Sequence, residues 1–304
     1  MALTIIPSVV AVPLHLVHIL EVILGTVFFS LLFCVSVKFL QGYKNKPICN
    51  TRCLTDNDCY DISINVVSII QACIAVFVGW VVMMNCRHDM IYDSHWLTNA
   101  YARFGVPYFY YDLVVMAMAL YLRTEPLKDR RISSNWHNLI PALKLFWVKR
   151  KLMFLHHFAL PLMFYPSLLY FRNGLGDFVV GAFYVFELPV PYIQTRHILA
   201  KLDCKASPVY ISNGLVMLGA MLIGRILMFP YLYYCYAQYR GIPFSQVLGK
   251  IPIKCTISCI ILGSLQVYWF CIMLRGTVSY FRKVIRQWLG ADKGQNAVDN
   301  SFGS

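Results

Sequence analysis

Charged residues are scarce in this chain of 304 residues, in which Asp, Glu, Lys and Arg together make up 13%. A soluble domain carries about 25% charged residues, so this composition excludes an ordinary soluble domain. Among these charged residues the acidic ones are fewer, with 14 Asp and Glu against 27 Lys and Arg. Hydrophobic residues make up 59% of the chain. The sequence therefore predicts a protein that crosses the bilayer several times.

Several familiar motifs are also absent. The sequence contains no Ser nucleophile elbow, no Walker phosphate loop, no dinucleotide-binding glycine pattern and no N-glycosylation sequon. No internal repeat is visible, which disfavours a transporter built from inverted repeats. The basic residues lie between hydrophobic runs. The net charge of +13 therefore indicates contact with membrane headgroups and not with nucleic acid.

Long unbroken apolar runs take up most of the chain. A membrane β-barrel would show short alternating segments instead, so the spans are expected to be helices. Each run has the length of about 17–25 residues that a bilayer requires. We therefore predict an all-α membrane protein with about seven transmembrane helices, at residues 16–40, 62–84, 106–122, 152–171, 178–195, 209–233 and 251–274.

These spans divide the chain into three regions. Residues 1–61 hold an N-terminal transmembrane helix and a loop, residues 62–274 hold the other six spans, and residues 275–304 form a tail. The tail begins with a basic amphipathic stretch, SYFRKVIRQWL, which is expected to lie on an anionic membrane surface. It continues with ADKGQNAVDNSFGS, whose polar composition predicts disorder.

The basic residues also predict the orientation. Twenty of the 27 lie in the tail or in the loops after the first, third and fifth spans, six lie on the other side, and Arg225 lies within a span. Because cytosolic loops are enriched in Lys and Arg, the N-terminus is expected in the lumen and the C-terminus in the cytosol. Cys49, Cys53 and Cys59 then share a cytosolic loop, which disfavours a disulfide, and a zinc site there lacks a fourth ligand.

The fourth span carries two adjacent histidines, His156 and His157, in the run LMFLHHFALPLMFYPSLLYF. An ionisable side chain at membrane depth costs about 2.5–3.5 kcal/mol and is a sign of function. Adjacent helix positions point about 100° apart, so one imidazole can act as a base or nucleophile while the other holds it. The alternative is a hydrogen-bonded packing pair.

Three basic residues, Lys149, Arg150 and Lys151, lie just outside this pair. They would form a cationic mouth on the cytosolic side of the membrane. Such a mouth would attract a phosphorylated cosubstrate. The alternative is that these residues only anchor the helix at the headgroups.

Three more charged residues lie inside predicted spans. Glu187 needs a proton or a partner there, and Pro189 and Pro191 predict a kink beside it. Because a short connection joins the fourth and fifth spans, Glu187 is expected to reach one of the histidines. Arg225 is the expected ion partner of Asp112 or of Glu187, and a structural salt bridge between spans would explain these residues equally well.

A polar loop between the second and third spans contains His88, Asp89, Asp93 and His95. Two histidines and two aspartates within eight residues are able to bind a metal. Ordinary polar loops show similar spacings, however. We therefore predict no metal site in this loop.

Seven short motifs occur in an order that resembles the TLC-domain family, which includes the ceramide synthases. The resemblance covers about residues 62–274 and is greatest to the group of TLC domain-containing protein 3. The motifs are Asp93–Leu97, Tyr111–Leu113, Leu155–His157, Gly176–Phe178, Glu187, Phe229–Tyr231 and Tyr268–Phe270.

The resemblance implies a membrane protein of the endoplasmic reticulum, with the Golgi as the alternative. It implies that His156 or His157 accepts the acyl group or acts as base when an acyl group moves from acyl-CoA to the amine of a sphingoid base. The basic mouth would meet the CoA phosphates, and acyl-CoA is a cosubstrate that needs no further cofactor. Oligomeric state is left open, including a homodimer. The residues expected to bind substrate are Asp112, Tyr184, Arg225, Lys149, Arg150 and Lys151, with Glu187 as a third catalytic residue.

One departure from the ceramide synthases concerns the helix after the histidines. Ceramide synthases carry two aspartates there, three residues apart. Counted from the histidine pair, Glu187 takes the place of the second and Tyr184 the place of the first. The alternative to catalysis is therefore a non-enzymatic regulator of membrane lipid composition. A seven-helix receptor is disfavoured, because the third span lacks an acidic–Arg–Tyr end and the seventh lacks an Asn-Pro turn.

Overall fold

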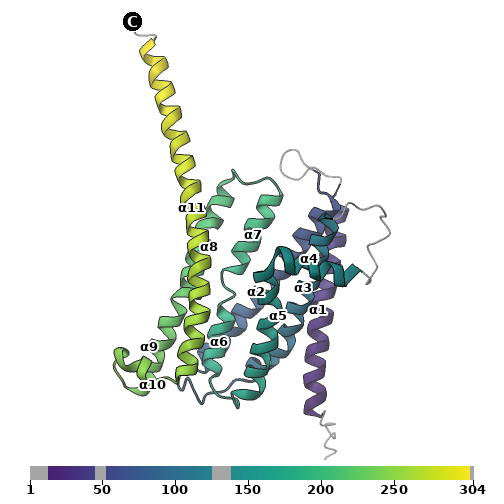
Figure 1. Cartoon of the computed structure of the whole chain (residues 1–304), viewed down its shortest axis with the longest axis vertical. Coiled ribbons are helices and arrows are strands. Elements are labelled where there is room, and N and C mark those ends of the chain that lie inside the picture. The colour runs from purple at the N-terminus through teal and green to yellow at the C-terminus, as the bar shows by residue number, and fades with distance from the viewer. Residues whose placement is uncertain (1–12, 45–52, 125–137, 302–304) are drawn as a thin grey trace, which may run out of the picture. The chain divides into compact units, whose positions relative to one another are not determined.

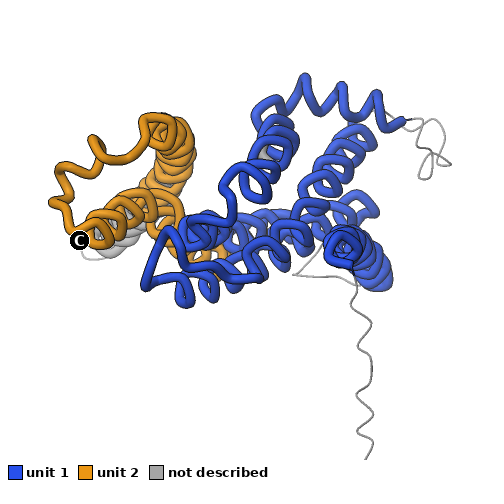
Figure 2. The backbone as a smooth tube through the Cα atoms, turned by 90° about the horizontal axis from the view of Figure 1, so that it is seen from below, with its two compact units in different colours: residues 1–205 blue, residues 206–304 orange. Residues whose placement is uncertain are grey.

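The computed structural model describes residues 13–44, 53–124 and 138–301. This described part of the chain is helical and contains no strand. It divides into two compact units, residues 1–205 and 206–304, which Figure 2 colours separately. The prediction of an all-α membrane protein is confirmed.

Six helical segments among the described residues are long and apolar enough to cross a membrane. They agree with six of the predicted spans, and α2 and α3 begin well before the predicted starts at 62 and 106. The segments (Figure 1) are α1 (Leu14–Gly42), α2 (Asp56–Asn85), α3 (Trp96–Thr124), α5 (Lys151–Pro166) with the π-helical turn η3 (Ser167–Phe171), α8 (Pro208–Met221) through η4 (Leu222–Ile226) into α9 (Met228–Arg240), and α11 (Ile253–Ser301).

The predicted span at 178–195 is wrong as a single helix. It consists of two short helices, α6 (Asp177–Val185) and α7 (Val190–Lys201). Between them, the backbone N–H of Glu187 bonds to the carbonyl of Tyr184 at 3.2 Å, and that of Val190 bonds to the carbonyl of Glu187 at 3.0 Å. These are turns of three residues. The break lies at the predicted kink, where Pro189 has no N–H to continue the helical ladder.

Two further helical stretches differ from the predictions. The helix α4 (Leu139–Lys149) occupies a segment that was expected to be loop, and its Ala142 and Phe146 are buried against α3. The tail after residue 274 was expected to lie on the membrane surface and then become disordered; the described residues are helical as far as Ser301, and the place of the tail on the membrane surface stays a prediction. Helix α11 continues to that residue, because each added residue of an existing helix gains a backbone hydrogen bond without a new nucleus.

Unit 1 is built around α2, which packs against α1, α3, α6 and α7. We call the two ends of this unit the basic end and the hairpin end. The basic end holds the ends of α1, α3 and α7 and the starts of α2 and α5. The hairpin end holds the loops at 86–95 and 172–176.

Two glycines let α2 and α6 approach closely. A Cβ atom on Gly79 would lie 2.5 Å from the carbonyl oxygen of Gly181, and one on Gly181 would lie 3.0 Å from the carbonyl oxygen of Gly79. Small residues at helix crossings allow such backbone contact inside membranes. The pair therefore fixes how deeply α6 sits against α2.

Replacing Gly79 by alanine is expected to lower the thermal stability of the protein, because overpacking a tight contact costs about 1–3 kcal/mol. The matched control is Gly219→Ala in α8, where a Cβ atom would meet nothing within 4 Å. That change should be neutral or slightly stabilising, because alanine favours a helix over glycine by about 1 kcal/mol. Thermal unfolding in detergent measures both, and equal melting temperatures for the two variants would contradict the close approach.

Candidate functional site

The histidine pair lies near the start of α5, at the basic end of unit 1. His157 is only 8% exposed, whereas His156 is half-buried. The two rings are 5.2 Å apart between centroids and lie edge to face. The pair thus consists of one imidazole held inside the packing and one that is more accessible.

Asp112 of α3 is the partner of the inner histidine. Its Oδ2 lies 3.4 Å from Nδ1 of His157, and the carboxyl residue as a whole is 3% exposed. The ring of Phe109, one turn earlier on α3, lies 6.0 Å from the imidazole. Asp112 thus forms a carboxylate–imidazole pair between α3 and α5, and the pairing of Arg225 with Asp112 or Glu187 stays a prediction.

Some buried polar atoms of this pair and its surroundings lack a hydrogen bond. Three buried atoms form no hydrogen bond with other described residues: Oδ1 of Asp112, the hydroxyl of Tyr111 and Nδ1 of His157. Buried groups of this kind call for an explanation, because an unmet polar atom costs about 1–3 kcal/mol. These atoms are therefore available to bind a proton or a polar group of a ligand.

The basic mouth lies where α4 meets α5. Arg150 connects the two helices, with a φ of −139°, and all three residues from Lys149 to Lys151 are exposed. They stand one to two turns before His156 in the chain. The structure thus places three solvent-facing cations at the same end of the unit as the histidines.

Tyr184 lies in α6 and Glu187 in the turn between α6 and α7, and both of these helices pack against α2. Glu187 is half-buried in the turn after α6. Tyr184 is buried and donates to the carbonyl of Thr98 at 2.8 Å. The pairing of Glu187 with a histidine stays a prediction, and the carboxyl group that lies beside His157 is that of Asp112.

Two polar residues of α2 were not singled out from the sequence. Gln71 donates to the hydroxyl of Tyr101 at 3.2 Å, and Ser68 accepts from the hydroxyl of Tyr108 at 2.9 Å. The ring of Tyr101 lies 4.8 Å from that of Tyr184. Ser68 and Gln71 are three residues apart inside an apolar run, and this spacing on one helix face is the signal that could have found them.

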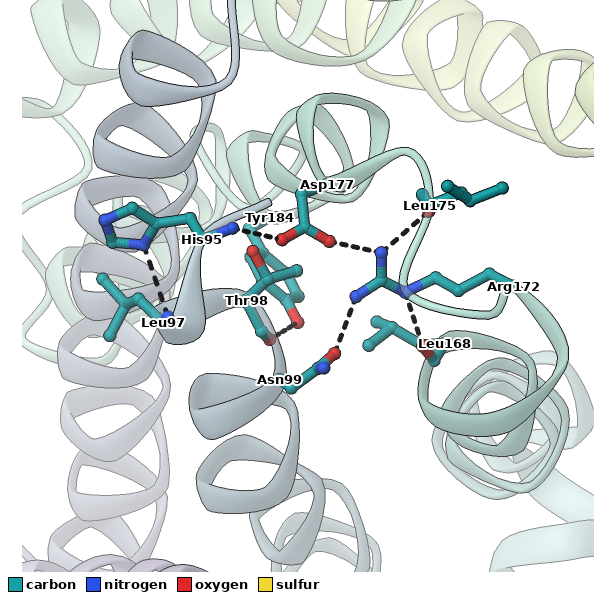
Figure 3. A network of polar contacts seen from close by, with 9 residues as sticks. All are labelled: His95, Leu97, Thr98, Asn99, Leu168, Arg172, Leu175, Asp177 and Tyr184. Carbon is teal, nitrogen blue, oxygen red and sulfur yellow. Dashed lines mark hydrogen bonds and ion pairs between the residues drawn. The ribbon is translucent and has the colours of Figure 1, made fainter. Parts of the chain in front are cut away.

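Asp177, at the start of α6, connects three segments of the hairpin end (Figure 3). It is 2% exposed, and its Oδ2 accepts from the backbone N–H of His95 at 2.7 Å. Its other oxygen pairs with Arg172. Arg172 also donates to the carbonyl of Leu175 at 2.8 Å and to Oδ1 of Asn99 at 2.7 Å. This network fixes both loops of the hairpin end to the first turn of α3.

The loop proposed as a metal candidate carries hydrogen bonds to the backbone instead. Asp93 accepts from the N–H of Asp89 at 2.8 Å, and Nδ1 of His95 accepts from the N–H of Leu97 at 3.3 Å. Within the described ranges, no three side chains of His, Cys, Asp or Glu are grouped so as to hold a metal ion. The polar residues of this loop shape it.

Cys86, which caps the end of α2 beside this loop, should be unreactive in the folded protein. Its burial raises the pKa of the thiol to about 11, and the nearby carboxylates of Asp177 and Asp93 act in the same direction. The thiolate is the reactive form of cysteine. A raised pKa therefore leaves only a very small fraction of Cys86 as thiolate at pH 8. N-ethylmaleimide at that pH should modify the exposed Cys53 and leave Cys86 intact until the protein is unfolded. Peptide mapping by mass spectrometry would contradict this if both thiols reacted equally fast.

An ionic cluster at the basic end was also missed. Lys201 of α7 lies 2.5 Å from Asp61 and 3.3 Å from Asp58, both on the first turns of α2, and Arg123 pairs with Asp61 as well. Thr55 and Asp58 form a capping box at the start of α2. The sequence signal was the Thr-x-x-Asp spacing of that box. The cluster joins α2, α3 and α7.

Arg225 belongs to unit 2, in the π-helical turn η4 between α8 and α9. It is 8% exposed and donates from Nη1 to Oε1 of Gln266 on α11 at 3.2 Å. Single π-helical turns often occur at functional sites. The assignment of Arg225 to a substrate site stays a prediction.

These features define an all-α, multi-pass membrane protein that buries a histidine–aspartate pair between two of its helices. Residues 61–275 match the family model of the TLC domain, and the chain therefore belongs to the TLC-domain family. A stretch of 160 residues is 26% identical to TLC domain-containing protein 4 of Homo sapiens and covers 51% of this chain. The match spans 58% of that relative, which is less than two thirds of its length. No solved structure matches the chain significantly.

Proposed function

We propose that this protein transfers a fatty acyl group from acyl-CoA to the amine of a sphingoid base, as part of sphingolipid homeostasis. The observation that carries the proposal is the Asp112–His157 pair with the more accessible His156 beside it. A carboxylate that holds one imidazole next to a second imidazole is an arrangement suited to moving a proton. The resemblance to ceramide synthases supplies the reaction.

In this proposal His156 is the catalytic base and His157 is a positioning residue. His156 takes a proton from the amine as the nitrogen attacks the thioester carbonyl carbon. The carbon–sulfur bond breaks, and the departing CoA thiolate takes a proton back from the imidazolium. Asp112 stabilises the positive charge that develops on the imidazole pair.

The other residues bind substrate. The cations of Lys149, Arg150 and Lys151 would attract the phosphates of CoA to the basic end. Glu187 would be the remaining carboxylate of the site, and Tyr184 and Arg225 would contact the lipid. This assignment requires the basic end to face the cytosol, with the N-terminus in the lumen of the endoplasmic reticulum or, alternatively, the Golgi.

A second candidate function is that of a non-enzymatic regulator of membrane lipid composition. The burial of His157 favours it, since an imidazole that is 8% exposed and packed beside Phe109 also fits a purely structural role. The two candidates differ in whether product forms.

The experiment that separates them uses purified protein in lipid nanodiscs with labelled acyl-CoA and a sphingoid base. The proposal expects an N-acylated product from the wild type and at least about 100-fold less of it from His156→Ala. Folding of the variant is checked by its melting temperature. A folded wild-type protein that forms no product with acyl chains of any length would refute the enzyme and favour the regulator.

A further inference from the structure

A second polar site lies at the hairpin end of unit 1, away from the histidine pair. A pocket of about 660 Å³ opens there between α1, α3 and the end of the α5–η3 segment. Its walls include the apolar side chains of Ile19 and Leu169 and the polar side chains of His18, Arg103 and Tyr165. The pocket therefore combines an apolar surface with a charged group.

The charged group is half of an ion pair. Nε of Arg103 donates to Oε2 of Glu21 on α1, and the two side chains are 13% and 22% exposed. Among the described residues, the two Nη groups of Arg103 and Oε1 of Glu21 take part in no other hydrogen bond or ion pair. The pair thus presents spare donors beside a spare acceptor, next to a pocket.

The depth of this pair suits a lipid headgroup. Glu21 lies seven residues after the first residue of α1, and Arg103 lies seven after the first residue of α3, which places both about 10 Å from the helix ends. Helices of 29 residues span about 43 Å, the thickness of a bilayer with its headgroups. The pair therefore lies near the level where headgroups meet acyl chains. Trp96 and Tyr170, which also line the pocket, are 75% and 68% exposed, as in an interfacial aromatic belt.

We propose that this pocket binds one zwitterionic phospholipid. The Nη groups of Arg103 bind its phosphate, and the carboxylate of Glu21 attracts its positively charged ammonium group. One acyl chain lies along Ile19 and Leu169. A cation and an anion side by side match a zwitterion, whereas a purely anionic lipid would be repelled by Glu21. The site lies at the opposite end of unit 1 from the histidine pair and does not depend on the proposed acyl transfer.

The test uses phosphatidylcholine with a photoactivatable diazirine on one acyl chain, in nanodiscs that contain the purified protein. Mass spectrometry should locate the cross-links on the pocket-lining parts of α1, α3 and η3. Arg103→Gln, which removes the phosphate donors, and Ile19→Trp, which fills the pocket, should each lower cross-linking there about tenfold. Leu20→Trp is the matched control, because Leu20 is an exposed neighbour outside the pocket, and it should cross-link as the wild type does.

Two results would overturn the proposal. In the first, cross-linking at these segments is unchanged by Ile19→Trp in a variant that folds normally. In the second, phosphatidylglycerol competes with the probe as well as phosphatidylcholine does, which would mean that Glu21 does not select a zwitterion. The Ile19→Trp variant keeps the test decisive even where Arg103→Gln fails to fold.

Discussion

The turnover number for acyl transfer is expected to fall by about 10²–10⁴-fold when His156 is replaced by alanine, which is the usual contribution of a general base. His156 is the more accessible member of the pair, and His157 beside it is held against Asp112. Without the outer imidazole, nothing at this position would take the proton from the attacking amine. The Michaelis constant for acyl-CoA should change little, because the basic mouth remains intact.

The matched control for this prediction is His197→Ala. His197 is an exposed histidine on α7 that interacts with Gln194 at 3.2 Å, so its loss removes an imidazole without touching the pair. Steady-state rates of the two variants, each checked for folding, give the comparison. Equal rates for His156→Ala and His197→Ala would remove His156 from the mechanism.

The largest loss of stability is expected from Asp177→Ala. This carboxylate is 2% exposed and holds both Arg172 and the backbone N–H of His95, as Figure 3 shows. Removing one partner of a buried ion pair costs about 3–5 kcal/mol, because the other charge is left uncompensated. The loops of the hairpin end would also lose their common attachment to α3.

A comparison with Asp56→Ala makes this prediction specific. Asp56 pairs with Lys44 at 2.6 Å, but its side chain is 55% exposed, and such surface pairs contribute about 0–1 kcal/mol. Melting temperatures in one detergent should therefore fall much further for Asp177→Ala than for Asp56→Ala. Comparable decreases would mean that the network at the hairpin end does not stabilise the fold.

The spans could be predicted because their signal is local. Twenty apolar residues in a row need only the thickness of the bilayer as a reference, and six of the predicted segments are present as long helices. The fifth span shows the limit of this reasoning. Pro189 and Pro191 predicted a kink, but the length of the break between α6 and α7 depends on which turn the freed carbonyls adopt.

The candidate site could be predicted only in part. His156 and His157 are conspicuous because they are ionisable residues in an apolar run. Their partner was not apparent, since Asp112 is 45 residues away in the chain and the register between α3 and α5 is set by side-chain packing. Gln71 and Ser68 of α2 were overlooked for the same reason, because their tyrosine partners lie on α3.

A double-mutant cycle between His156 and Asp112 tests the central claim most directly, namely that the aspartate and the two histidines act as one catalytic unit. The rate of acyl transfer is measured for wild type, His156→Ala, Asp112→Asn and the double variant. The account predicts that Asp112→Asn lowers the wild-type rate about 10–100-fold, the usual cost of losing a carboxylate that orients a histidine from behind. The same Asp112→Asn change should alter the residual rate of His156→Ala by less than about twofold, because the effects of substituting residues that act as a unit do not add. The account would be contradicted if Asp112→Asn lowered the rate by the same factor in the wild type and in His156→Ala, or if it changed neither rate.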